Sequence, residues 1–275
     1  MALTPLTDSV AGKAMLRVYD GAQKGATAFF RNRPLLETLM ALLEQHQGKP
    51  LRILFHAGSI GAEVYSFVVY ALRTGLVDRC PMEIYTTDLN PQFLQFAEEA
   101  SYPAEVLDSF TDEERVWFER VDTGIVRPVE VVRRRVWFLP ACSFVDAVPP
   151  EGEVFDVVFI LNALTYVTPD QQTECLRNVA RYNTDLLVAC AFHPDTIRSD
   201  LLTNGYEPVT TRIAEIHNSW TERIRTEALP APESPDYSWV IPPYSEVPEH
   251  EFRFCSIFRK IASSHPTFTR PEDHA

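Results

Sequence analysis

A short loop between an apolar run and an amphipathic stretch holds the first residues that could do chemistry. Residues 51–66, LRILFHAGSIGAEVYS, predict a strand, a loop with two glycines and a helix, which is how many α/β folds open a nucleotide site. The loop has no G-x-G-x-x-G and no lysine, and Glu63 falls in the first helical turn. A carboxylate there is favoured by the helix dipole but opposes a pyrophosphate bound at the same amides. The loop therefore indicates a ligand with a cationic head.

A second acid, Asp88, stands at the end of the apolar run MEIYTTDL. In such folds a carboxylate at this place accepts hydrogen bonds from ribose hydroxyls, although aspartates at strand ends also cap helices. S-adenosylmethionine (SAM) combines an adenosine for Asp88 with a sulfonium and an amino group that Glu63 could hold. Together the two acids favour SAM as the cofactor.

Ligands of an open parallel sheet bind beyond the carboxyl ends of its strands, and the residues expected at that edge form the candidate site. No metal site is expected, because the five cysteines are widely spaced and form no C-x-x-C pair. The cofactor candidates are Ala57, Ser59, Gly61, Glu63, Asp88, Leu89, Cys142, Ser143, Asn162 and Ala163, and the catalytic candidates are Tyr166 and His193.

Methyl transfer from a sulfonium is an in-line displacement, so the protein must align the acceptor with the methyl group. A hydroxyl or ammonium acceptor also needs a base, for which His56, Tyr166 and His193 are the candidates. His56 lies near the end of an apolar strand and is expected to be a core histidine, whereas His193 follows the fifth expected strand, where acceptor groups commonly sit. His217 and Trp220 could wall the pocket, but we expect both to have a packing role.

The elements that must position these residues form an α/β pattern. From Leu51 short apolar runs alternate with amphipathic stretches, and the helices after Asn90-Pro91 and Thr168-Pro169 begin with capping residues. This alternation predicts a doubly wound parallel sheet. After residue 193 we expect a helix that ends near Gly205, two β-like runs over about 208–226 and a closing strand at EFRFCSIFRKI.

Three further regions complete the expected domain organisation. Helical spacing of apolar residues predicts an N-terminal helical cap over 1–46, including a helical piece before Thr27, and residues 47–262 then form the main domain. Six prolines make 229–250 a long, lid-like insertion without regular structure. Residues 263–275 are expected to be a flexible tail.

The composition limits the partners. A formal net charge of −13 disfavours nucleic acid, because sequence-independent binding of phosphates rests on clustered Lys and Arg. No apolar run approaches the roughly 20 residues that span a bilayer, and the N-terminus lacks the layout of a signal peptide. We therefore expect a cytoplasmic protein without a membrane or nucleic-acid partner, while its oligomeric state stays unknown.

Four stretches of the chain occur in the order of a known family: TAFFRN (27–32), the segment 51–66, IYTTDLNPQFLQFAEEASYPAEVL (84–107) and FDVVFILNALTYVTPDQQTECL (155–176). They resemble the T-x-F-F-R segment, the G-x-S-T-G-E-E-P-Y-S loop, the I-x-A-T-D-I segment with its G-x-Y-P continuation, and the F-D-x-I-F-C-R-N-V-x-I-Y-F segment of the chemotaxis receptor glutamate methyltransferases (CheR type). The resemblance implies the seven-stranded, Rossmann-like α/β fold of class I SAM-dependent methyltransferases.

The resemblance also implies roles for five residues. Arg31 would contact the carboxylate end of SAM, and Gly61 would let the backbone approach the cofactor. Glu63 would hold the amino group of SAM, Asp88 would bind the ribose, and Asn162 would border the methionine part.

The chain departs from the family in ways that bear on the acceptor. Leu161 replaces an arginine, Cys142-Ser143 stands where the family has Asn-Leu beside the adenine, and the G-G-x-L-x-x-G-H-S-E ending is absent. Tyr166 matches the tyrosine of I-Y-F and would line the acceptor site. We therefore expect a SAM-dependent methyltransferase that acts on an O or N atom of a small-molecule acceptor. The alternatives are a protein glutamate carboxyl methyltransferase and a non-catalytic SAM-binding or sensing module.

Overall fold

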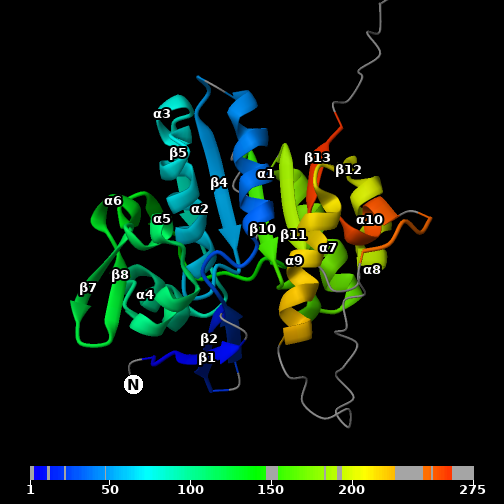
Figure 1. Ribbon diagram of the computed structural model, residues 1–275. Coiled ribbons are helices and arrows are strands. Elements are labelled where there is room, and N and C mark those ends of the chain that lie inside the picture. The colour runs from blue at the N-terminus through cyan, green and yellow to red at the C-terminus, as the bar shows by residue number, and fades with distance from the viewer. Residues whose placement is uncertain are drawn as a thin grey trace, which may run out of the picture.

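A seven-stranded sheet forms the centre of the computed structural model, in the order β12-β13-β11-β10-β4-β5-β9 (Figure 1). Neighbours pair in parallel except β13, which runs antiparallel to β11 and β12. The strands are β4 (Leu51–His56), β5 (Met82–Thr86), β9 (Val136–Phe138), β10 (Val157–Leu161), β11 (Leu186–Cys190), β12 (Tyr206–Pro208) and β13 (Ile257–Lys260). The structure describes residues 3–10, 13–21, 23–46, 48–146, 154–182, 184–190, 194–226, 244–248 and 250–261.

The connections of this sheet reverse direction at its middle. β4 pairs with β5 on one side and with β10 on the other, so the chain first winds outward to β9 and then returns to continue from β10. The crevice at such a switch point is where doubly wound folds bind their ligands. The predicted doubly wound, class I SAM-methyltransferase fold is confirmed.

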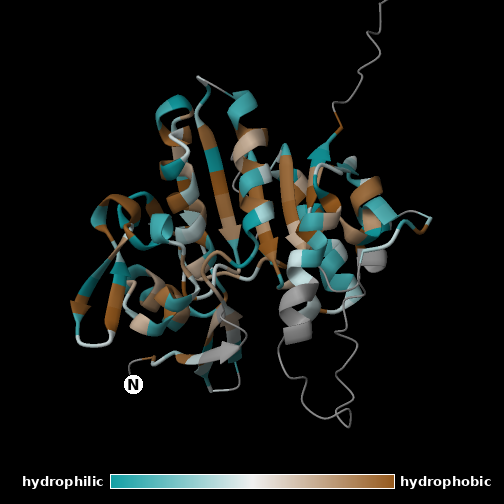
Figure 2. Ribbon diagram, viewed as in Figure 1, coloured by the Kyte–Doolittle hydropathy of each residue, from teal (hydrophilic) through white to brown (hydrophobic). Residues whose placement is uncertain are grey.

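Helices cover both faces of the sheet because successive strand residues point to opposite sides. Ile53 and Phe55 of β4 pack in the cluster that contains α1 (Arg33–Leu43), α2 (Ala62–Arg73) and part of α9 (Ile213–Thr226). Leu54 belongs to the second cluster, with α7 (Pro169–Arg181), α8 (Pro194–Thr203) and α10 (His250–Phe254). The middle strands are accordingly among the most hydrophobic segments in Figure 2.

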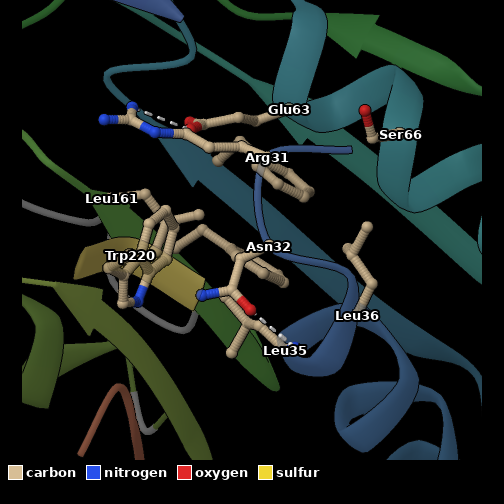
Figure 3. A pocket seen from close by; sticks show the side chains of 10 residues that line it. Arg31, Asn32, Leu35, Leu36, Glu63, Ser66, Leu161 and Trp220 are labelled. Atoms are coloured by element: carbon tan, nitrogen blue, oxygen red, sulfur yellow. Dashed lines mark hydrogen bonds and ion pairs between the residues drawn. The ribbon is translucent and has the colours of Figure 1, made fainter. Parts of the chain in front are cut away.

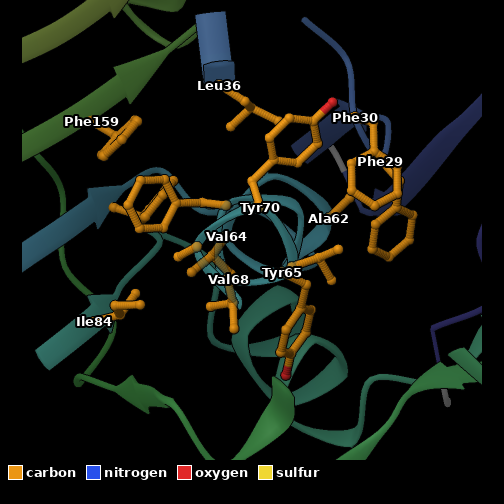
Figure 4. Close-up of a cluster of buried hydrophobic side chains, with 14 of the residues drawn as sticks. Phe29, Phe30, Leu36, Ala62, Val64, Tyr65, Val68, Tyr70, Ile84 and Phe159 are labelled. Carbon is orange, nitrogen blue, oxygen red and sulfur yellow. The ribbon is translucent and has the colours of Figure 1, made fainter. Parts of the chain in front are cut away.

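Helix α2, which follows the first loop, is enclosed by the rest of the protein. Nine of its residues are buried, and Figure 4 shows apolar side chains around it from the sheet, from α1 and from the segment before α1. The Phe55 and Phe159 rings stack beneath it with centroids 4.0 Å apart and an interplanar angle of 7°. This packing fixes the start of α2, and with it Glu63, relative to the sheet.

The expected helical piece before Thr27 is wrong. Three segments here form an antiparallel sheet instead, β1 (Leu6–Val10), β2 (Lys13–Asp20) and β3 (Gln23–Thr27), near the carboxyl ends of the main strands (Figure 1). Leu16 and Val18 are fully buried while Tyr19 is half exposed, which is the alternation of a half-buried strand. Asp20-Gly21 opens the turn between β2 and β3, and D-G is a strong hairpin signal. The expected helix over the following residues is present as α1, extended by η1 (Glu44–His46).

The β-like runs expected over 208–226 are also wrong, because most of that segment is helix α9. Ile213, Ile216, His217 and Trp220 are buried at the i, i+3, i+4, i+7 spacing of one helical face. The sequence EFRFCSIFRKI gives a short helix, α10, before the closing strand β13. Most of the insertion expected over 229–250, and the tail over 263–275, lie outside the described residues.

A lobe at the β9 end of the sheet completes the fold. It contains α4 (Pro91–Glu99), η2 (Ala104–Ser109), α5 (Asp112–Arg115), α6 (Glu130–Arg133) and a small sheet of β6 (Tyr102–Pro103), β7 (Phe118–Asp122) and β8 (Ile125–Pro128). Helix α3 (Leu76–Arg79) instead joins α2 to β5. Among the described helices, none combines the length and the apolar character needed to cross a bilayer.

Candidate functional site

The first loop coils tightly between β4 and α2. Ala57, Ser59 and Gly61 have φ values of +54°, +50° and +87°. The carboxylate of Asp88 holds this loop, since its Oδ2 accepts a hydrogen bond from the Ser59 backbone N–H (2.8 Å) and its Oδ1 accepts one from the Asn90 N–H (2.9 Å). Burial raises the pKa of Asp88, and the hydrogen bonds from Asn90 and Ser59 oppose that rise. Asp88 therefore has a structural role as well as a place in the site.

A pocket of about 320 Å³ lies between the first loop, β3 and the segment that follows β10. Its walls include Glu63 and Asp88, the two acidic residues for which the sequence predicts a role in cofactor binding. The expected residues that line it are Arg31, Ala57, Ser59, Glu63, Asp88, Leu89, Ser143, Asn162, Ala163 and Tyr166. The structure thus gathers most of the candidate residues around one space, while His193 lies outside the described residues.

Two expected cofactor residues do not line this pocket. A Cβ on Gly61 would stand 3.1 Å from Ala97 Cβ and from the Tyr102 hydroxyl, so Gly61 is needed for its left-handed backbone and its packing rather than for approach to a ligand. Cys142 instead anchors its loop to the end of β5. Its backbone N–H donates to the Asp88 carbonyl (3.0 Å), and its Sγ lies 3.4 Å from the hydroxyl of Thr87.

Strand β3 forms one wall of the pocket, which the sequence did not predict. Residues 23–27 all line the pocket, opposite the segment after β10. Gly25 lets the strand approach the loop, because a Cβ there would come within 3.0 Å of both Ser59 Oγ and Phe93 Cε2. The Asn90 amide also donates to the Asp20 carboxylate (3.0 Å), which ties the turn before β3 to α4. The Asp20-Gly21 turn was the available signal for this hairpin.

An ion pair marks one end of the pocket. Arg31 Nη1 lies 3.4 Å from Glu63 Oε1, and about nine-tenths of each side chain is buried (Figure 3). Phe30, with a φ of +48°, donates its backbone N–H to Ser66 Oγ (2.8 Å), which fixes the backbone just before Arg31 against α2. This end therefore offers a fixed cation and a fixed anion side by side, as an amino acid's carboxylate and ammonium require.

Four lining residues carry a buried polar atom for which the described part of the chain provides no hydrogen-bond partner: Thr27 Oγ1, Arg31 Nε, Ser59 Oγ and Asn162 Nδ2. A buried donor or acceptor without a partner destabilises a protein, so a group of such atoms around one pocket indicates that a ligand or ordered water binds there. The two nitrogens are donors that fit a carboxylate, and Glu63 and Asp88 supply acceptors for an ammonium and for ribose hydroxyls. This donor and acceptor set fits SAM.

The two candidate bases within the described residues differ in their access to the pocket. Tyr166, in η3 (Leu164–Tyr166), lines the pocket and is 64% exposed. His56 is a buried core histidine, as expected, and burial lowers its pKa to about 4. His56 does not line the pocket, so it has no access to an acceptor there. His217 packs on the Phe254 ring, with centroids 4.5 Å apart, in the packing role expected for it.

Comparison with known proteins gives a family match. Residues 25–186 match the family model described as CheR methyltransferase, SAM binding domain. The chemotaxis protein methyltransferase of Vibrio parahaemolyticus serotype O3:K6 (strain RIMD 2210633) is 26% identical over 189 residues, which cover 64% of this chain and 67% of the relative. Chemotaxis protein methyltransferase 2 of Pseudomonas aeruginosa PAO1 is 31% identical over 161 residues, 56% of each chain. The chain thus spans between about half and two thirds of the length of its curated relatives.

Among solved structures, magnesium protoporphyrin IX methyltransferase (ChlM) from Synechocystis PCC 6803 with bound SAM matches with a TM-score of 0.39 and 12% identity, covering 64% of this chain and 70% of that one. The fold assignment rests on the strand order instead. The names of the curated relatives point to a protein acceptor. They contradict the small-molecule acceptor expected from the sequence.

Proposed function

Because the chain belongs to the CheR methyltransferase family, we propose that it transfers a methyl group from SAM to a carboxylate side chain of a protein, with glutamate as the acceptor residue. One observation carries the proposal. A single pocket places the Arg31–Glu63 pair and Asp88 along its walls together with four buried polar atoms that lack partners in the described chain.

The described residues suggest how the cofactor is seated. Arg31 and Asn162 would donate to its carboxylate, Glu63 would accept from its amino group, and Asp88 would accept from the ribose. Because Asp88 already accepts two backbone N–H groups, its orientation is fixed before the ligand arrives. When bound, SAM supplies an activated methyl group on a sulfonium.

A carboxylate acceptor needs no general base, whereas Tyr166 is the one expected base among the described lining residues. A glutamate side chain is ionised near neutral pH and needs no proton removed before it attacks. Its oxygen forms the new bond to carbon while the bond to sulfur breaks, and the opposite charges of the two reactants disappear. Apolar walls such as Ala163, Leu161 and Phe144 favour that neutralisation because they solvate ions poorly. Tyr166 would then position the acceptor rather than deprotonate it.

The test is transfer of label from methyl-tritiated SAM to protein fractions of the source organism. We expect labelled protein whose label is released as volatile methanol by mild alkali, because a carboxyl methyl ester is cleaved under conditions that leave N-methyl groups intact. The Asp88→Asn variant should label at least about tenfold more slowly, since it loses an acceptor for the ribose and for one backbone N–H.

The matched control is Asp108→Asn, an exposed position in η2 that should label at the wild-type rate. Alkali-resistant label would refute the carboxylate acceptor. If the protein binds S-adenosylhomocysteine but labels no protein, the proposed activity itself is wrong.

A further inference from the structure

The side chain that supports Arg31 comes from a part of the chain beyond the matched family segment. Trp220 lies on α9, is 4% exposed, and its ring centroid is 5.4 Å from Arg31 Cζ. Trp220 lines a small cavity with Arg31 and Glu63, next to the cofactor pocket that the same two residues line (Figure 3). The sequence favoured a plain packing role for this tryptophan.

We propose that Trp220 is a positioning residue that orients the Arg31 guanidinium toward the amino-acid end of the cofactor. A guanidinium has two faces and an edge that carries its N–H donors. A tryptophan ring holds a cation through the ring face and uses none of those donors. Nη1 points to Glu63 and the buried Nε has no partner in the described chain, so donors at the edge stay available for a carboxylate.

The Trp220 side chain is itself fixed by a hydrogen bond to Ser256, the residue directly before β13. Its indole N–H donates to Ser256 Oγ (3.2 Å), and the Ser256 carbonyl accepts the backbone N–H of Ala189 in β11 (3.0 Å). A second bond joins α9 to the segment of Arg31, since the Asn32 amide donates to the Ile216 carbonyl (2.9 Å). The position of the Arg31 side chain is therefore fixed from both sides, by α2 through Glu63 and by α9 through Trp220.

This inference rests on the assignment of the Arg31 end to the methionine part of SAM and is independent of the acceptor. It predicts a loss of affinity that depends on which part of the ligand is present. S-adenosylhomocysteine has the amino-acid end, and 5′-methylthioadenosine has the same adenosine and a thioether but no amino-acid end. A residue that acts through Arg31 should affect the first ligand and not the second.

The experiment measures both dissociation constants by calorimetry for the wild type, Trp220→Phe and Trp220→Leu. Both variants lose the indole N–H, so their difference isolates the aromatic face. We expect Trp220→Leu to weaken S-adenosylhomocysteine about tenfold and 5′-methylthioadenosine less than about twofold, with Trp220→Phe close to the wild type. In an Arg31→Lys background the leucine substitution should have a smaller effect, because a lysine lacks the planar group that stacks.

Equal losses for the two ligands, no loss for either, or equal behaviour of the phenylalanine and leucine variants would overturn the proposal. If Trp220→Leu does not fold, Trp220→Met provides the same non-aromatic comparison with more volume. Because no acceptor is used, a failure to methylate protein would refute the proposed function and leave this result unaffected.

Discussion

At the scale of single residues, Ser66 shows how one hydroxyl fixes the backbone beside Arg31, which lines the pocket. Ser66 accepts the backbone N–H of Phe30 (2.8 Å) and donates to the carbonyl of Ala62 (2.6 Å). Phe30 is in the left-handed region, which is uncommon for a residue with a side chain. The hydroxyl of Ser66 thus supports the left-handed residue directly before Arg31. Ser66 itself lies on α2, three positions after Glu63.

We predict that Ser66→Ala lowers both stability and cofactor affinity. The Phe30 N–H would be left buried without a partner, at a cost of about 1–3 kcal/mol in unfolding free energy. Denaturant unfolding and titration with S-adenosylhomocysteine measure the two effects. Ser101→Ala, where an exposed hydroxyl has only a long bond to the Glu99 carbonyl, is the control and should change neither. Reduced stability with unchanged affinity would show that Ser66 does not act on Arg31.

The place of a single residue could be predicted from the sequence where its contacts are with residues near it in the chain. Glu63 and Asp88 follow strands that the sequence makes plain, and both line the pocket. The packing of Gly61 could not be predicted, because its close neighbours, Ala97 and Tyr102, come from a later part of the chain. Thr27 was missed for the same reason, since its place in the site depends on how β3 folds over the loop.

At the scale of elements, β3 covers the pocket only because Gly25 has no side chain. In Gly25→Ala the Cβ would stand 2.8 Å from Val18 Cγ2 and 3.0 Å from Ser59 Oγ, so the strand must move away from the loop. We expect a loss of about 1–3 kcal/mol in stability and weaker binding of S-adenosylhomocysteine. Gly124→Ala, at a φ of +78° with open space around it, should lower stability by about 1 kcal/mol without changing affinity. Equal affinities in the two variants would contradict this account of β3.

The junction of α1 with α9 depends on Asn32. Its Oδ1 caps α1 by accepting the Leu35 N–H (3.0 Å), and its Nδ2 donates to the Ile216 carbonyl. Asn32→Ala should lower the unfolding free energy by about 1–3 kcal/mol, because it removes the cap and the hydrogen bond to the Ile216 carbonyl. Asn32→Ser can still cap the helix and should recover about 1 kcal/mol of that loss in denaturant unfolding. Equal losses in the two variants would show that the cap contributes nothing.

Elements with strong local signals were predicted, and those with competing signals were not. Asn90 and Thr168 cap α4 and α7 as expected, because capping depends only on the adjacent backbone. The segment of α9 contains β-branched and aromatic residues that favour a strand, but tertiary burial selects its helical spacing. In β2, Met15 is buried beside Leu16, so the alternation of buried and exposed residues is too incomplete to exclude a helix before pairing with β1 and β3 is known.

At the scale of the whole molecule, His56 couples folding to pH. Burial lowers its pKa from 6.5 to about 4, so on acidification the unfolded chain takes up the proton before the folded one. Stability is therefore complete above about pH 6.5 and decreases as the pH falls toward 4, by up to about 3 kcal/mol. We expect His56→Gln to flatten the pH dependence of unfolding free energy in that window. His46→Gln, at a more exposed histidine in η1, should retain the wild-type slope, and a His56 variant with that slope too would contradict the assignment.

The contact between the segment of Arg31 and α9 also determines when the pocket can exist. Asn32 and Ile216 are 184 positions apart, so the ribosome makes one side of this junction long before the other. A domain generally folds as a unit, and contacts between residues distant in sequence form only when both partners are available. A nascent chain that ends before α9 would contain the first loop, Glu63 and Asp88, but it would lack the residues of α9 that contact Arg31 and Asn32. Affinity for the cofactor should therefore rise only after α9 has left the ribosome.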